Sequence, residues 1–288
     1  MAVTHFSDEV IQNMQQKGLD MLLYFKEICD KNNLMFYFCG GCCIGAVRDG
    51  GFIPWDDDVD VFMPRPDYEK LLEIWDSVST NERYFLQYTT KDKLTKNLFA
   101  TLCDSETTYI KTYQKNLDIN HGIALDILPL DGCPTKSLAR KLQKINAIIY
   151  SLYLLDEPPM NHGAVIKTIG RIMLAVVPKR LKYRIWRSAE KRMSRYPFYK
   201  SERITELCSG PDYMQNEYYF EDFKSAVYYN FEGYKMPLPV GFDRYLRTAF
   251  GDYTELPPPE KRIIHHEIEF CDVNNSYKKY KHKYYCTK

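Results

Sequence analysis

The segment Phe52–Met63, with the sequence FIPWDDDVDVFM, constrains the fold of this chain more than any other. It carries four aspartates within five residues: Asp56, Asp57, Asp58 and Asp60. The last of them lies inside the apolar run Val59–Met63, which predicts a β-strand. Because strand side chains alternate between faces, the first, third and fourth aspartates are expected on one face, and the second on the other face or in the preceding turn. Crowded carboxylates repel one another and are costly to bury, and a hard divalent cation is the usual compensation.

Two glycines, Gly40 and Gly41, lie upstream of the aspartates, between the predicted strand Met35–Cys39 and the predicted short helix Cys42–Arg48. Glycines let a ligand approach the backbone, and a helix N-terminus offers free N–H groups and a positive dipole end. A Gly-Gly pair by itself usually marks only a tight turn. Together with the aspartates that follow, it indicates a phosphate-binding turn in a metal-dependent site that handles nucleotides.

A further acid, Asp126, lies in the apolar run Ile123–Leu128, a predicted strand that we expect to end at Pro129. Two adjacent strands could place Asp58, Asp60 and Asp126 around one or two Mg²⁺ ions, with Mn²⁺ as the alternative ion. Metal ions about 4 Å apart stabilise both the attacking and the leaving oxygen of a phosphoryl transfer. The three acids are therefore the predicted metal ligands and catalytic residues.

The aspartate run has two other interpretations. Asp56 and Asp57 could belong to a solvated acidic turn or a helix cap, and this alternative stays open. A calcium-binding EF-hand loop is the second alternative, but Val61 stands where such a loop needs glycine, and Asp67 stands where it needs a bidentate glutamate.

Several other polar residues have two interpretations each. Arg48 and Arg65 flank the acidic strand, and could bind diphosphate oxygens bidentately or pair with the same aspartates. Histidines at His121 and at His265–His266 could orient substrate or shuttle protons, or be ordinary hydrogen-bonded residues. The Cys39-x-x-Cys42 pair is better explained by packing than by zinc or redox chemistry, because no second ligand pair accompanies it.

Composition narrows the class of protein. The chain has 288 residues, enough for one large domain or two lobes, and a net charge of +1 gives no argument for nucleic-acid binding. Nine cysteines without a repeating spacing argue against a disulfide scaffold and favour a reducing compartment. No signal-peptide pattern and no apolar run of about 18 residues is present, so we expect a cytoplasmic protein without a transmembrane helix.

The pattern along the chain predicts an α/β (α+β) fold with a mixed sheet, a helical insertion and a Tyr-rich C-terminal lobe. We expect three segments: a catalytic lobe at residues 1–132, the insertion at 133–205 and the C-terminal lobe at 206–288. Further helices are predicted at Ser7–Asn33 and Tyr68–Val78, and further strands at Tyr84–Tyr88, Asn97–Cys103 and Thr107–Lys111.

Two predicted helices of the insertion, Val165–Val177 and the very basic Lys179–Arg195, suggest a surface that could lie on the anionic inner face of a membrane. The alternative is a core helix beside a solvated basic helix.

The stretch Cys39–Met63, followed by Pro64–Tyr68, resembles the signature of the LicD family, which includes fukutin and fukutin-related protein and has the nucleotidyltransferase fold. Leu98–Ile110, His121–Gly132 and Tyr245–Pro259 resemble later blocks of the same family. The resemblance covers roughly residues 20–132 and 235–270 and leaves a variable helical middle.

The resemblance implies transfer of a phosphorylated alcohol from a CDP-alcohol to the hydroxyl of an oligosaccharide or lipid-linked glycan, with release of CMP. Phosphocholine is the type case, and ribitol or glycerol phosphate are variants. By position, Asp58 and Asp60 become Mg²⁺ ligands, Asp126 the third acid, and Gly40–Gly41 the phosphate turn. Cys42 stands where the family usually has serine or threonine, and a thiol is a poorer hydrogen-bond donor to phosphate.

We therefore predict a Mg²⁺-dependent phosphotransferase. A choline headgroup would call for an aromatic cage, with Trp55 and some of the tyrosines as candidates. Two rivals stay open: a nucleotidyltransferase of the same fold that releases pyrophosphate, and a non-enzymatic binding protein with a degenerate site.

Overall fold

The computed structural model describes residues 6–158, 163–264 and 266–287. Within these ranges the helices are α1 (Asp8–Asn32), α2 (Gly40–Arg48), α3 (Arg65–Val78), α4 (Ser137–Leu155), α5 (Gly163–Val176), α6 (Lys179–Met193) and α7 (Phe242–Phe250). The strands are β1 (Tyr37–Phe38), β2 (Val59–Pro64), β3 (Tyr84–Gln87), β4 (Ala100–Asp104), β5 (Thr108–Lys111), β6 (Ala124–Cys133), β7 (Arg203–Thr205), β8 (Tyr218–Tyr219), β9 (Ala226–Phe231), β10 (Tyr234–Pro239) and β11 (Ile268–Asp272). The predicted mixed α/β class is confirmed.

The central sheet has the strand order β1-β2-β6-β4-β3, and β7 and β8 extend it from the end of β6. Its middle pair, β2 and β6, is parallel, whereas the other pairs of this sheet are antiparallel. In the parallel register Asp60 lies opposite Asp126. Residues at matching positions of adjacent strands project from the same face, so this pairing brings the two acids side by side.

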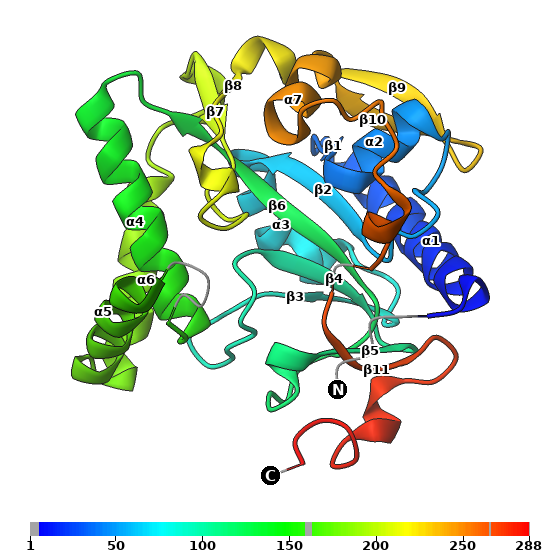
Figure 1. Ribbon diagram of the computed structural model, residues 1–288, viewed down its shortest axis with the longest axis horizontal. Helices are drawn as coiled ribbons and strands as arrows, with labels where there is room; N and C mark the ends of the chain where they lie inside the picture. The colour runs from blue at the N-terminus through cyan, green and yellow to red at the C-terminus, as the bar shows by residue number, and fades with distance from the viewer. Residues whose placement is uncertain (1–5, 159–162, 265, 288) are drawn as a thin grey trace.

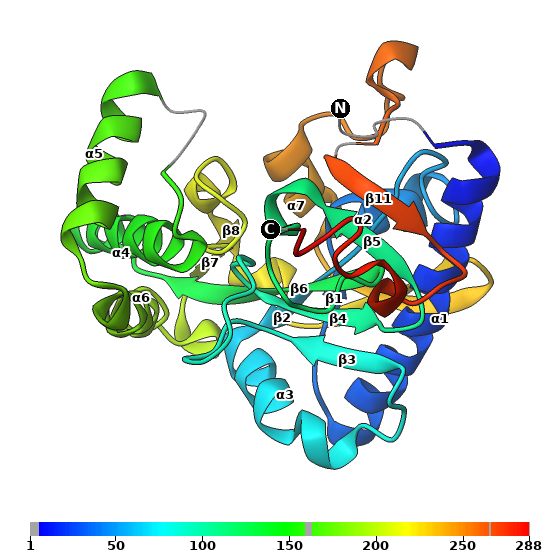
Figure 2. The ribbon, with the colours of Figure 1, turned by 90° about the horizontal axis from the view of Figure 1, so that it is seen from below.

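Helices cover both faces of the sheet (Figures 1 and 2). Helices α1 and α3 pack on one face, and α2 and α7 lie on the other. Helix α1 is defined by its caps: the Ser7 side chain accepts a hydrogen bond from the Val10 N–H, and Asn33 adopts the left-handed conformation at the end. Its inward stripe buries Met14, Leu22 and other apolar residues against the sheet.

Prolines shift two boundaries from their predicted positions. We expected the strand to end at Pro129, but β6 continues through this proline to Cys133. Its pairing with β4 stops at Ile127, so Pro129 lies where only β2 borders the strand, and the missing N–H costs little. Helix α3 begins at Arg65 with Pro66 in its first turn, where a helix needs no N–H donor.

The helical insertion has a small hydrophobic core of its own. Helices α4 and α6 bury Tyr150, Trp186 and Met193 between them and against the chain near Leu207. Helix α6 therefore buries one side and exposes its basic side to solvent. No helix in the described part of the chain is long and apolar enough to cross a bilayer.

The C-terminal segment shares the main core. The hairpin β9–β10 contributes Phe231, and α7 contributes Tyr245, to the same cluster of buried residues that contains Phe38 and Phe62. Strand β11 pairs with β5, so the C-terminal end of the chain returns to the N-terminal half of the protein. This arrangement places residues from after position 200 around the pocket described next.

Candidate active site

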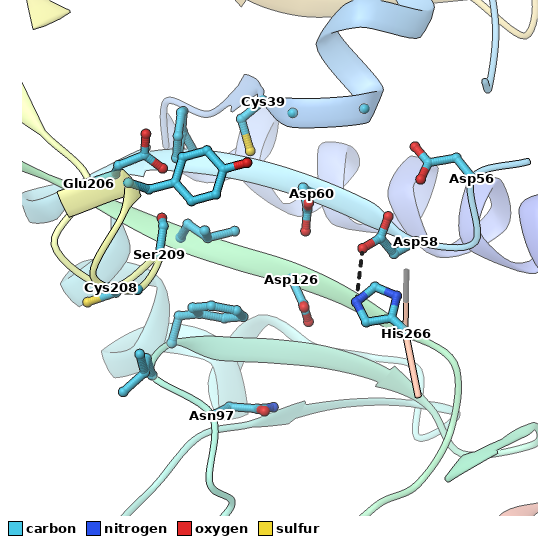
Figure 3. A pocket seen from close by; sticks show the side chains of 18 of the residues that line it. Cys39, Asp56, Asp58, Asp60, Asn97, Asp126, Glu206, Cys208, Ser209 and His266 are labelled. Carbon is cyan, nitrogen blue, oxygen red and sulfur yellow. Dashed lines mark ion pairs between the residues drawn. The ribbon is translucent and has the colours of Figure 1, made fainter. Parts of the chain in front are cut away.

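A pocket of about 750 Å³ opens on the face of the sheet that carries α2 and α7 (Figure 3). Four aspartates line it: Asp56, Asp57, Asp58 and Asp60. Asp126 lines it from β6, and residues of the insertion and of the C-terminal segment close it from other sides. The structure thus brings together the acids singled out in the sequence.

Asp126 is the most buried of the three predicted ligands and is incompletely paired. One carboxylate oxygen, Oδ1, is buried and has no hydrogen-bond partner among the described residues. The other, Oδ2, lies 3.6 Å from the ammonium group of Lys111 at the end of β5. A buried acceptor without a partner costs free energy unless a ligand satisfies it, so Asp126 is suited to bind a ligand such as a metal ion.

Burial and neighbouring carboxylates raise the pKa of Asp58 and of Asp60. Burial raises the pKa of Asp60 well above its usual value, and the neighbouring charges of Asp58 and Asp126 raise it further. Burial likewise raises the pKa of Asp58. The same negative charges raise the pKa of Lys111 against the opposing effect of its burial, so that Lys111 stays charged.

His266 joins the aspartate run from the C-terminal segment. Its Nδ1 lies 3.2 Å from Oδ1 of Asp57, and its Nε2 lies 3.6 Å from Asp58, as the dashed line in Figure 3 marks. The Tyr109 hydroxyl also donates to Asp57. Burial would raise the pKa of Asp57, but these partners outweigh it and lower the pKa. Asp57 is therefore a fixed anion that orients His266 toward Asp58.

The other predicted histidines have different positions. His121 does not line the pocket; its Nε2 is 2.9 Å from the Leu117 carbonyl, and its ring packs on Tyr285. His265 lies outside the described residues.

The glycine turn faces the aspartates directly. A side chain at Gly41 would place its Cβ 2.0 Å from Oδ2 of Asp56, so a larger residue here would displace the Asp56 carboxylate. Gly40 begins α2 with a φ of +50°, and its N–H donates to the Tyr245 hydroxyl at 3.0 Å. Both glycines line the pocket, with one amide at the helix N-terminus already in use.

Three predicted binding residues do not line the pocket. Cys42 is buried beneath it, and its sulfur accepts a hydrogen bond from the Asp60 N–H at 3.4 Å. Arg48 pairs with Asp49 on the far end of α2. Arg65 makes a bidentate, buried pair with Asp131, at 2.8 and 2.7 Å. It thus pairs with Asp131 and not with the aspartate run.

The donor set fits a hard divalent cation. Among the described residues, Asp56, Asp57 and Asp58 offer oxygens that all lie within 4.8 Å of one another. Asp60 and Asp126 add carboxylates beside them, one with an unpartnered oxygen. Oxygen ligands of this kind are what Mg²⁺ and Mn²⁺ prefer.

Comparison with known proteins gives a family. Residues 33–129 match the family model described as "LicD/FKTN/FKRP, nucleotidyltransferase domain". The chain is also 27% identical, over 89% of its length and 96% of the relative's, to the lipopolysaccharide cholinephosphotransferase LicD of Haemophilus influenzae. The chain belongs to the LicD family. It is a LicD-like phosphotransferase.

A second similarity is local. The uncharacterized protein RP689 of Rickettsia prowazekii is 32% identical over 74 residues, which are 24% of this chain and 28% of that protein. The matched family domain, residues 33–129, contains Asp58, Asp60 and Asp126. The insertion and the C-terminal segment of this LicD-family chain lie outside it.

Sequence reasoning missed Lys111 and Tyr109, and it missed Glu206, which lines the pocket just after β7. Lys111 is the last residue of the short strand β5, and Glu206 directly follows β7, in a part of the chain outside the blocks that resemble the family. No local sequence pattern marks either residue. Three neighbouring acids do call for a nearby positive charge, and Lys111, at the end of a predicted strand, was one candidate.

Proposed function

We propose that this LicD-family enzyme catalyses Mg²⁺-dependent transfer of a phosphorylated alcohol, phosphocholine in the first instance, from a CDP-alcohol to a glycan hydroxyl. CMP leaves. The observation that carries the proposal is the parallel pairing of Asp60 with Asp126 inside the shared pocket. The alignment with a cholinephosphotransferase over most of both chains supports it. The acceptor would be an oligosaccharide or a lipid-linked glycan.

In this proposal Asp58, Asp60 and Asp126 hold the metal, which is Mg²⁺ or, as an alternative, Mn²⁺. A bound ion supplies positive charge to the phosphoryl oxygens and allows a diphosphate to enter a cluster of carboxylates. The unpartnered Oδ1 of Asp126 is available to the ion or to the proton of the attacking hydroxyl.

Residues of the chain itself set up the reaction. Lys111 offsets part of the negative charge beside Asp126, and the Asp57–His266 pair orients Asp58. The acceptor oxygen forms a bond to the phosphorus that carries the alcohol, and the bond from that phosphorus to the CMP oxygen breaks. The hydroxyl proton passes to a carboxylate or to water.

Donor binding is expected to stabilise the fold only when Mg²⁺ is present. The measurement is thermal unfolding with Mg²⁺ and, in turn, CDP-choline, CDP-ethanolamine, CDP-ribitol and CDP-glycerol. A ligand at about 100 times its dissociation constant adds roughly 2.7 kcal/mol to the free energy of unfolding. The donor that raises the melting temperature most is then offered with a glycan acceptor, and CMP is quantified.

Two results would contradict the proposal. A shift with a nucleoside triphosphate alone, followed by release of pyrophosphate, would favour a nucleotidyltransferase. No shift with Mg²⁺ and no turnover with any donor would favour a binding protein with a degenerate site. EDTA in place of Mg²⁺ serves as the matched control for each donor.

We further propose that the insertion contacts an anionic membrane surface. Residues 163–195 contain ten Lys or Arg side chains and one acid, Glu190. On α5, the side chains of Ile169, Ile172 and Val176 are 52%, 57% and 71% exposed. Exposed apolar side chains beside concentrated positive charge match the interface of an anionic bilayer, which offers phosphates and an apolar layer together. A lipid-linked acceptor would then meet the enzyme at that surface.

The membrane proposal predicts sedimentation of the protein with phosphatidylglycerol-containing vesicles, and weaker sedimentation at high salt. The double variant Ile169→Asp/Ile172→Asp is expected to remain in the supernatant. Tyr228→Asp, an equally exposed position on the β9–β10 hairpin, is the control and should sediment like the unchanged protein. Equal sedimentation of the double variant, or none of the unchanged protein, would refute the membrane contact.

A further inference from the structure

Glu206 is a buried acid at the pocket wall for which the proposed reaction has no use. Glu206 is only 4% exposed, and one of its carboxylate oxygens accepts a hydrogen bond from the Tyr218 hydroxyl. Burial raises the pKa of Glu206 to about 7, and the Tyr218 hydroxyl limits the rise. In Figure 3, Glu206 lies at the opposite end of the pocket from Asp56, with Asp60 and Asp126 between them.

This carboxylate has no positively charged partner within residues 6–158, 163–264 and 266–287. Among the ion pairs of the described residues, none involves Glu206. Lys96 also lines the pocket, but it pairs with Glu157. A buried carboxylate without a counter-charge is costly, and the cost is recovered when a ligand brings a cation.

Aromatic rings also line this pocket. Tyr213 and Phe250 are 38% and 37% exposed, and their ring centroids are 6.1 Å apart with a tilt of 54°. The Tyr245 ring lies 6.4 Å from that of Phe250. Tyr213 and Glu206 both line the pocket, and burial, followed by the charge of Glu206, raises the pKa of Tyr213. Ring faces together with a carboxylate are the chemistry that attracts a quaternary ammonium group.

Trp55, the aromatic candidate named from the sequence, is less suited to this role. The guanidinium of Arg262 lies over its ring, 5.5 Å from the centroid. A ring face that already carries a cation has less attraction for a second one, so the rings beside Glu206 are the better surface.

We infer that Glu206, Tyr213 and Phe250 form a subsite for the quaternary ammonium group of the donor's alcohol. The inference rests on the proposed function, because it assumes a donor whose diphosphate lies at the aspartate cluster. It selects the cationic alcohol among the donors of that class. Ribitol and glycerol bring no charge to Glu206, and a neutral nucleobase would leave its carboxylate uncompensated.

The test separates recognition of the alcohol from recognition of the nucleotide. Choline and CMP are titrated separately into the full-length protein by calorimetry, and KM is measured for CDP-choline and CDP-glycerol. Glu206→Gln should weaken choline binding, and raise KM for CDP-choline, at least tenfold. CMP binding and KM for CDP-glycerol should stay within about twofold. Asp76→Asn, which removes an exposed acid on α3 outside the pocket, is the control and should bind choline normally.

A second variant guards against misfolding of the buried site. Tyr213 is partly exposed, so Tyr213→Ala should fold, as its melting temperature will show, and should weaken choline binding. Tyr213→Phe keeps the ring and should bind choline nearly as well as the unchanged protein. If both Tyr213 variants bind choline like the unchanged protein, the aromatic part of the subsite is wrong.

Failure of this inference is distinguishable from failure of the proposed function. Turnover of CDP-choline with an unchanged KM in Glu206→Gln would overturn the subsite and leave the function standing. Loss of CMP binding with choline binding intact would assign Glu206 to the nucleobase and overturn the inference. Choline binding that depends on Glu206, without CMP release from any donor, would retain the subsite and overturn the function.

Discussion

Asp60→Asn is expected to lower turnover by about a thousandfold while leaving the protein folded. An amide cannot replace a carboxylate as a ligand of Mg²⁺ without loss of charge, and charge stabilisation of the transferring phosphoryl group is worth several kcal/mol. A loss of about 4 kcal/mol corresponds to a factor of about a thousand in rate. Asp60 lies beside Asp126, and burial together with the neighbouring carboxylates raises its pKa well above the usual value.

The fold should survive because the charge of Asp60 opposes folding in the absence of metal. Burial and the neighbouring acids raise its pKa, so its ionised form is disfavoured in the folded state. Removing that charge should leave the melting temperature in EDTA unchanged or higher. The stabilisation by Mg²⁺ should largely disappear.

The measurement combines CMP release with thermal unfolding in Mg²⁺ and in EDTA. Asp76→Asn, which removes an exposed acid on α3, is the matched control and should change neither quantity. Normal activity of Asp60→Asn would remove the metal site from the proposal. A large drop in melting temperature in EDTA would mean that Asp60 stabilises the fold despite its repulsion by the neighbouring acids.

Arg65→Met is expected to lower the free energy of unfolding by about 3–5 kcal/mol. The Arg65 guanidinium makes two hydrogen bonds to Asp131, whose side chain is fully buried, and lies 3.7 Å from Glu190 on α6. Methionine fills similar space but leaves the Asp131 carboxylate buried without its partner. The pair joins the start of α3 to the end of β6 and to the insertion.

Urea unfolding at equilibrium measures this effect, with the slope m checked for constancy. Arg48→Met is the matched control: Arg48 pairs with Asp49 on a partly exposed surface, where a pair is worth about 1 kcal/mol or less. The double variant Arg65→Met/Asp131→Leu should recover much of the loss, because no unpaired charge remains. If Arg65→Met instead kept normal stability and raised KM for the donor, Arg65 would be a diphosphate ligand after all.

Patterns local in sequence predicted a good part of the fold. Apolar periodicity and caps located α1 almost to the residue, from Ser7 to Asn33, and the alternating run Val59–Met63 lies within β2. Prolines misled at two boundaries, because Pro66 and Pro129 occupy positions where a missing N–H is tolerated. That tolerance depends on the neighbouring strand or on the position in the first turn, which the proline alone does not reveal.

The predicted site residues divide in a similar way. Asp60 and Asp126 come together because they lie at paired positions of β2 and β6, and Asp58 lies in the same pocket from the residue just before β2. The flanking arginines do not join them, because a long side chain can reach several acids. Arg65 pairs with Asp131, a fully buried acid on β6.

By itself, the sequence determined the α/β class, most helices and strands, the acidic cluster and the family to which the chain belongs. These properties depend on residues a few positions apart in the sequence. The spacing of such residues can be compared directly with the period of a helix or a strand. Only the tertiary structure decided that His266 and Glu206 share one pocket with the aspartates, and that Lys111 lies 3.6 Å from Asp126. They come from segments up to about two hundred residues apart, and no local pattern specifies which distant segments meet, because that depends on how the whole chain packs its apolar surfaces.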